Sequence, residues 1–145
     1  MTFVEVLGIL LENFSLDQHF LTDKGMETYQ FHVDNDIALW CTITDIDTDI
    51  ALCTALPNIM RTDTVALQRL LTASAQGRGV GPGSIGYDMF GNVALTTPVR
   101  VAAMTKARVV QAIASHLSYV AHWRGNEFES NTQPIVALEE IIMVP

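Results

Sequence analysis

Apolar residues recur at helical spacing in the first patterned stretch of the chain, residues 3–14. One stripe along this stretch consists of Phe3, Leu7, Leu10, Leu11 and Phe14. Val4, Val6 and Ile9 widen the stripe until little polar surface remains. The pattern therefore predicts a helix with more apolar surface than packing on one side would bury. Such a helix is either covered on most sides or presents an apolar surface to a partner.

Period-2 patterning follows and predicts three antiparallel strands in a meander. The strands are expected at residues 19–23, 26–34 and 37–44, with turns at 24–25 and 34–36. In the third strand, Leu39 and Cys41 share an apolar face, whereas Trp40 lies on the opposite and less apolar face. Two interpretations of Trp40 are open: a neighbouring element covers it, or it is an exposed anchor for a partner.

The rest of the chain predicts two more helices and two more strands. We expect a helix at 64–75, strands at 84–88 and 92–99, and a last helix at 105–123. Thr62 or Asp63 is suited to cap the first of these helices, and Thr105 the second. Residues 45–60 are less regular. The order helix, three strands, helix, two strands, helix predicts a two-layer α+β fold with a twisted, mostly antiparallel sheet.

The length and composition of the chain fit one folded domain with one core. It has 145 residues, of which 49% are hydrophobic and 17% charged. We place the domain at residues 1–125 and treat residues 126–145 as a tail that ends in the apolar run PIVALEEIIMVP. The formal net charge of −8 argues against nucleic acid or an anionic membrane as a partner.

The apolar start of the chain does not have the pattern of a signal peptide. It contains Glu5 and Glu12, and no Lys or Arg precedes its apolar run. No apolar run in the chain reaches the roughly 18–20 residues that a membrane-spanning helix needs. We therefore expect a cytoplasmic protein without membrane insertion.

The sequence contains no set of residues with the spacing of a catalytic or metal site. Cys41 and Cys53 form no CxxC pair and lie among apolar residues, so we interpret both as reduced core residues. His116 and His122 are six positions apart, whereas metal-binding pairs on one helix usually sit four apart. The Asp-x-Asp-x-Asp run at 45–49 lacks the Gly and the bidentate Glu of a calcium loop. We therefore expect no enzyme activity, no metal and no cofactor.

Six of the nine glycines lie in the stretch GRGVGPGSIGYDMFG, residues 77–91. A Walker loop would end in Gly-Lys-Ser/Thr, and this stretch contains no Lys. A dinucleotide-binding fingerprint would follow a strand and precede a helix, whereas here the helix precedes and the strand follows. We therefore interpret Gly77 to Gly83 as a helix stop and chain reversal, and Ile85 to Gly91 as a strand and its hairpin turn.

Four segments between residues 67 and 124 form a combination with a known counterpart. They are LQRLLTASA, the glycine-rich turn, GYDMFGNVALTTPV and a helix ending in YVAHWR. Their order resembles the class I effector chaperones of bacterial type III secretion, the Tir chaperone-like family. The family's Leu-Leu pair, glycine hairpin and closing Trp correspond to Leu70-Leu71, Gly86 to Gly91 and Trp123. With the helix and strands that precede them, the resemblance covers roughly residues 2–125.

The resemblance implies an ATP-independent chaperone that binds the N-terminal region of a secreted effector, the client, and keeps it soluble and competent for secretion. It also implies a homodimer formed through the second helix and the strand after the glycine turn. The candidate dimer residues are Leu67, Leu70, Leu71, Ile85 and Tyr87. The candidate client-binding residues are Val4, Leu7, Leu11, Phe14 and Trp40. An ordinary core position is an equally good interpretation of each of these residues.

Two other functions remain open. One is a small-molecule or regulatory binding domain of similar α+β build, in which the glycine turn lines a pocket. The other is an enzyme that uses Cys41 or His32, although no set of partner residues is visible for either side chain.

Overall fold

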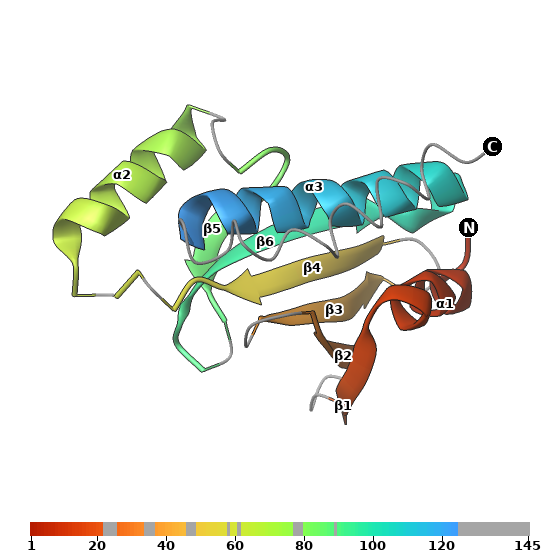
Figure 1. Ribbon diagram of the computed structural model, residues 1–145. Helices are drawn as coiled ribbons and strands as arrows, with labels where there is room; N and C mark the ends of the chain where they lie inside the picture. Colours follow the sequence, from red (N-terminus) through yellow and green to blue (C-terminus); the bar gives the residue numbers. More distant parts are fainter. Residues whose placement is uncertain are drawn as a thin grey trace.

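The computed structural model describes residues 1–21, 26–33, 37–45, 49–57, 59–60, 62–76, 80–88 and 90–124 (Figure 1). The expected tail at 126–145 and the expected turns at 24–25 and 34–36 lie outside these residues. The division into a domain and a tail therefore stays a prediction.

The described residues form three α-helices and six strands, with a short 3-10 helix before the last α-helix. In chain order they are α1 (Phe3–Asn13), β1 (Ser15–Leu21), β2 (Glu27–His32), β3 (Ala38–Asp45), β4 (Asp49–Ala55), α2 (Thr64–Ala75), β5 (Ser84–Tyr87), β6 (Val93–Arg100), η1 (Val101–Ala103) and α3 (Lys106–Arg124). The strands make one open sheet in the order β1-β2-β3-β4-β6-β5, and every neighbouring pair is antiparallel. The predicted α+β fold class and the alternation of helices and strands are confirmed.

The number of strands before α2 differs from the prediction, because the stretch that looked irregular contains β4. This strand lies in the middle of the sheet and pairs with both β3 and β6. Ile50 and Leu52 point into the core, while Ala51 and Cys53 lie on the other face and are only partly exposed. In a strand with one solvated face, apolar and polar residues alternate along the sequence. In β4 small apolar residues stand at the positions where polar ones would be expected, so this alternation is not visible.

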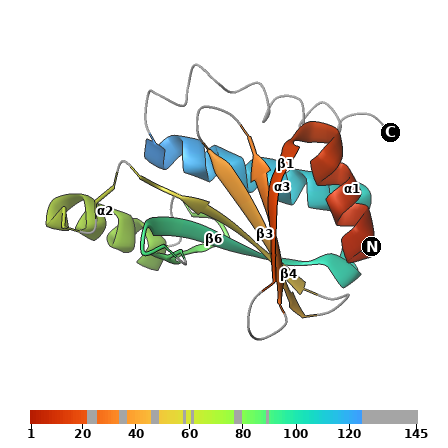
Figure 2. The ribbon, with the colours of Figure 1, turned by 90° about the horizontal axis from the view of Figure 1, so that it is seen from below.

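Two helices, α1 and α3, cover one face of the sheet, and the main core lies between them and the strands (Figures 1 and 2). Phe31, Leu39 and Leu52 form the sheet side of this core and are fully buried. A second, smaller cluster lies where α2 meets the β5–β6 hairpin and the end of α3, around Leu70 and Val120. The second helix lies at that end of the sheet, away from α1.

Two of the expected helix caps are confirmed by hydrogen bonds. The backbone N–H of Ala66 donates to Asp63 Oδ1 at the start of α2. At the start of α3, the N–H of Arg108 donates to Thr105 Oγ1. Each bond satisfies one of the N–H groups that a helix N-terminus leaves without an internal partner.

A polar triad inside the core ties α3 to the neighbouring strands β4 and β6. The ring of His116 is fully buried, with Nε2 2.9 Å from Thr54 Oγ1 and Nδ1 2.8 Å from Thr97 Oγ1. A neutral imidazole has one donor and one acceptor nitrogen, so the two hydroxyls satisfy both. Burial lowers the pKa of His116 to about 3, which keeps the ring neutral.

Candidate functional site

One side of α1 is an exposed apolar stripe. Val4 is 75% exposed and Leu11, two turns later on the same side, is 54% exposed. Leu7 lies between them and is half-buried against the main core. Gly8 is next to open space, because no neighbouring atom stands within 4 Å of the position that a Cβ would take there. Phe14 is only 6% exposed and belongs to the core. Of the α1 residues expected to contact a client, Val4 and Leu11 are thus at the surface and Phe14 is not.

The strand that follows α1 continues this apolar surface to an edge of the sheet. Among the described residues, β1 pairs with β2 on one side and with no strand on the other. Leu16 and Leu21 are exposed along it. A register shift between Leu16 and Gln18 marks an irregularity in the edge. We refer to Val4, Leu7, Leu11, Leu16 and Leu21 together as the α1–β1 surface.

A second apolar surface lies on α2 and β5. Leu71 and Tyr87 are exposed, while Leu67 and Ile85 are half-buried against the smaller core cluster. Leu70, the neighbour of Leu71, is fully buried in that cluster. Adjacent helix residues point about 100° apart, so one member of the Leu-Leu pair packs inward and the other faces outward. We refer to Leu67, Leu71, Ile85 and Tyr87 as the α2–β5 surface.

Trp40 lies on the face of the sheet opposite α1 and α3, as the pattern predicts, and its indole is 9% exposed. The ring of Phe90, in the β5–β6 turn, packs edge-to-face against it with a centroid distance of 5.4 Å. Of the two interpretations of Trp40, the covered one is therefore correct for the isolated chain. Phe90 is itself 67% exposed.

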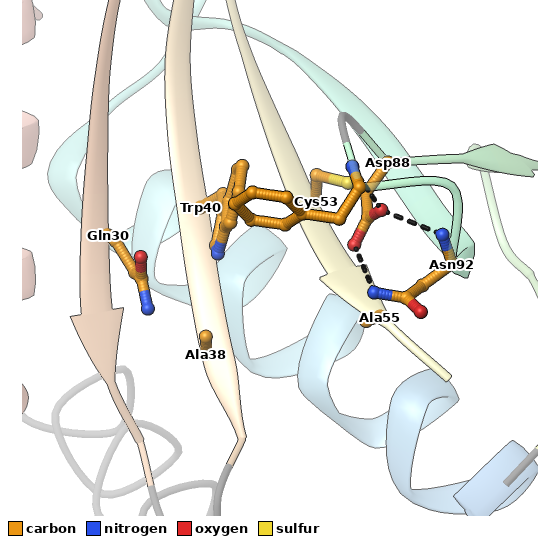
Figure 3. A pocket seen from close by; sticks show the side chains of 8 residues that line it. Gln30, Ala38, Trp40, Cys53, Ala55, Asp88 and Asn92 are labelled. Carbon is orange, nitrogen blue, oxygen red and sulfur yellow. Dashed lines mark hydrogen bonds between the residues drawn. The ribbon is translucent and has the colours of Figure 1, made fainter. Parts of the chain in front are cut away.

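A hollow of about 220 Å³ opens beside Trp40 (Figure 3). It is lined by Gln30, Ala38, Trp40, Cys53, Ala55, Asp88, Phe90 and Asn92. A second hollow of about 280 Å³ lies on the other side of Phe90 and Asn92, and Ile59 and Met60 give it an apolar wall. Because the two hollows share Phe90 and Asn92, they are neighbours on one surface. We refer to the first as the Trp40 hollow.

The carboxylate of Asp88 organises the turn that forms the far wall of the Trp40 hollow. Its Oδ1 accepts hydrogen bonds from the backbone N–H groups of Phe90 and Asn92, both at 2.9 Å. Its Oδ2 accepts a third from the Asn92 side-chain amide at 3.3 Å. Gly91 has a φ of 79°, which closes the turn at low steric cost. Sequence reasoning missed this site, because Asp88 and Trp40 meet only through the packing of the hairpin on the sheet.

At Gly81 and Gly83 the glycine stretch turns the chain directly against neighbouring residues, which leaves no space for a ligand at these two positions. Gly81 has a φ of 56°, and a Cβ there would stand 2.5 Å from Tyr119 Cε2. A Cβ at Gly83 would stand 2.8 Å from the carbonyl oxygen of Thr96. The interpretation of this stretch as a chain reversal fits these contacts. Gly77 and Gly79 lie outside the described residues.

The side chains considered for catalysis are poorly placed for it. Burial raises the pKa of the Cys41 thiol to about 12 and also raises the pKa of Cys53, so neither thiol is activated. His32 pairs with Ala38 and Cys41 with Tyr29, so the two side chains lie on opposite faces of the sheet. Asp49, the last residue of the Asp-x-Asp-x-Asp run, forms an ion pair with Arg100, in which Oδ1 and Nε are 3.5 Å apart.

Within the described part of the chain, no group of three or more His, Cys, Asp and Glu side chains is arranged to hold a metal ion. None of the described helices combines the length and the apolar character that crossing a membrane requires.

Solved structures share this fold, among them chains of two complexes. A chain of the HopA1–SchA chaperone–effector complex matches with a TM-score of 0.59 and 17% identity, over 84% of this chain and 92% of that chain. A chain of the ExsC–ExsE complex matches with a TM-score of 0.59 and 15% identity, over 86% of this chain and 95% of that chain. No family model matches the chain, and no curated protein does. At this identity the likeness establishes the fold, which agrees with the fold that the sequence resemblance implies.

Proposed function

We propose that this protein is an ATP-independent chaperone of the class I type, which binds the N-terminal region of a type III secreted effector in the bacterial cytoplasm. The observation that carries the proposal is the α1–β1 surface, where exposed apolar side chains adjoin a strand edge that has no partner among the described residues. The shared fold with a chain of a chaperone–effector complex supports it.

The α1–β1 surface offers an extended client two kinds of contact. The edge of β1, which pairs with no described strand, presents backbone N–H and C=O groups to which a client strand can add. Alternate side chains of that strand can then pack on the exposed leucines of β1 and on Val4 and Leu11. The net charge of −8 keeps a molecule with such a surface soluble.

The first prediction concerns client binding. Replacing both Val4 and Leu11 by aspartate is expected to weaken client binding at least tenfold, because two carboxylates would have to be desolvated under the client. Co-expression with the products of the adjacent reading frames, followed by affinity capture, supplies the client. Titration by calorimetry, with and without ATP, then measures the affinity.

A matched control variant is Gln111→Asp with Ser118→Asp. These two positions have the same spacing on an exposed side of α3 and introduce the same charge. The control variant should bind the client as the natural chain does. Equal affinity of both variants, or a requirement for ATP, would contradict the proposed site or mechanism.

We also propose that the protein is a homodimer formed through the α2–β5 surface. Two observations support this. Leu71 on α2 and Tyr87 on β5 are exposed, and Leu70 is the one buried side chain of α2, so most of this helix is not covered by the described chain. Light scattering after size-exclusion chromatography is expected to give twice the chain mass of 15.9 kDa. The variant Leu71→Asp should shift the mass to that of one chain.

Val65 provides the control for this second prediction. It is as exposed as Leu71 and lies on the same helix, but six residues away and therefore about a third of a turn around it. The variant Val65→Asp should leave the mass unchanged. A natural chain that elutes only as a monomer would rule out the dimer.

A further inference from the structure

The Trp40 hollow lies on the face of the sheet opposite the α1–β1 surface and is built like a side-chain pocket. Its volume of about 220 Å³ exceeds the roughly 150 Å³ that holds a benzene molecule in an engineered cavity. Trp40 and Phe90 supply aromatic surface, and Ala38 and Ala55 leave the space between the strands open. The hollow is therefore large enough to accept one long side chain of a partner.

Among the described residues that line the hollow, Asp88 is the one with a charged side chain, and the turn holds its carboxylate in place. A carboxylate has about four acceptor sites, and the hydrogen bonds inside the turn occupy three of those of Asp88. The described residues leave one acceptor site on Oδ2 for a ligand. Because the turn already fixes the carboxylate, binding would not have to order it first.

The lining selects a cationic ligand with an aliphatic stem. None of the described residues that line the hollow is a Lys, Arg or His, and the chain carries a net charge of −8, so an anion is disfavoured. A purely apolar group would cover the remaining acceptor site of Asp88 and the amide of Gln30 without offering either of them a hydrogen bond. A basic side chain matches both parts, because its methylenes can lie against the aromatic and alanine surface while its head group meets Asp88.

The second hollow indicates what kind of molecule carries that basic group. It begins on the other side of Phe90 and is walled by apolar residues such as Ile59 and Met60. A free cation would use only the first hollow, whereas a peptide can place neighbouring side chains in both.

We propose that the Trp40 hollow binds a basic side chain of a peptide segment from a partner protein. The head group pairs with Asp88 and the stem lies between Trp40, Ala38 and Ala55. This site is separate from the proposed client surface on α1 and β1, and it does not depend on the chaperone function.

Titration of the ¹⁵N-labelled full chain with N-acetyl-arginine amide tests the proposal, with the indole N–H signal of Trp40 as the reporter. The probe is expected to shift this signal with millimolar affinity, and N-acetyl-leucine amide is expected to bind at least fivefold more weakly. The variant Asp88→Asn keeps an oxygen for both backbone N–H groups but removes the charge, and it should weaken arginine binding at least fivefold.

Two further variants separate this site from other effects. Ala38→Leu fills the hollow without touching the carboxylate and should abolish the shift, which keeps the proposal testable if Asp88→Asn fails to fold. The α1 variant with aspartate at Val4 and Leu11 should bind the arginine probe unchanged. Equal binding of the leucine probe, or full arginine affinity in the folded Asp88→Asn or Ala38→Leu variant, would overturn the proposal.

Discussion

Replacing Gly83 by alanine is expected to lower the free energy of unfolding by roughly 2–3 kcal/mol. The added Cβ would stand 2.8 Å from the carbonyl oxygen of Thr96 and 2.9 Å from that of Val80. Both are backbone atoms, Thr96 in β6 and Val80 in the segment before β5, so relief requires the chain itself to move. Chemical denaturation measured by circular dichroism gives the change.

Gly8 and Gly86 are matched controls for this experiment, because no atom stands within 4 Å of the Cβ position at either glycine. Gly8→Ala is expected to stabilise the protein by about 0.5–1 kcal/mol, since alanine favours the interior of a helix such as α1. A loss of stability at Gly8 equal to that at Gly83 would show that crowding is not the cause.

Replacing His116 by leucine is expected to cost roughly 2–4 kcal/mol, because the hydroxyls of Thr54 and Thr97 lose their partner inside the core. The triple variant, with valine at both threonine positions as well, removes all three polar groups. It should therefore recover much of this loss. Denaturation of both variants measures the difference. A triple variant no more stable than His116→Leu would mean that the triad's hydrogen bonds are not what stabilises this position.

The same triad predicts how stability depends on pH. The folded state holds His116 neutral down to a pKa of about 3, whereas an unfolded histidine binds a proton near pH 6.5. Between these values the unfolded state binds more protons, so the stability from this group is lost as the pH falls below 6.5. The loss is at most about 1.4 kcal/mol for each pH unit. The triple variant should lose less stability than the natural chain between pH 7 and pH 5.

The sequence predicted those features of the fold that depend on local patterns. The stripe of the first helix, the meander of β1 to β3 and the caps Asp63 and Thr105 all follow from neighbouring residues. β4 was missed because Ala51 and Cys53, on its less buried face, are small and apolar and so do not alternate visibly with the core residues. Apolar and polar residues alternate in a strand when the second face of the sheet is in contact with solvent. Here the second face, opposite α1 and α3, is partly covered at Trp40.

The candidate sites could be predicted only in part, because burial within an apolar stripe depends on the tertiary structure. Leu70 and Leu71 look alike in sequence, yet one is fully buried and the other exposed. The pairing of Trp40 with Phe90 depends on how the β5–β6 hairpin packs on the sheet. No local pattern connects these two residues, which are far apart in the chain.

The position of α3 at the end of the described chain has a consequence for synthesis on the ribosome. The β1–β4 meander can pair locally as it emerges, since its contacts are close in sequence. The buried side chains of α3 are made after every strand of the sheet: Val109, Val110, Ile113, Ala114, His116, Leu117 and Val120. Until then the core face of the sheet is exposed to other nascent chains. During its own translation, this protein is therefore exposed to the same danger of aggregation from which we propose it protects its client.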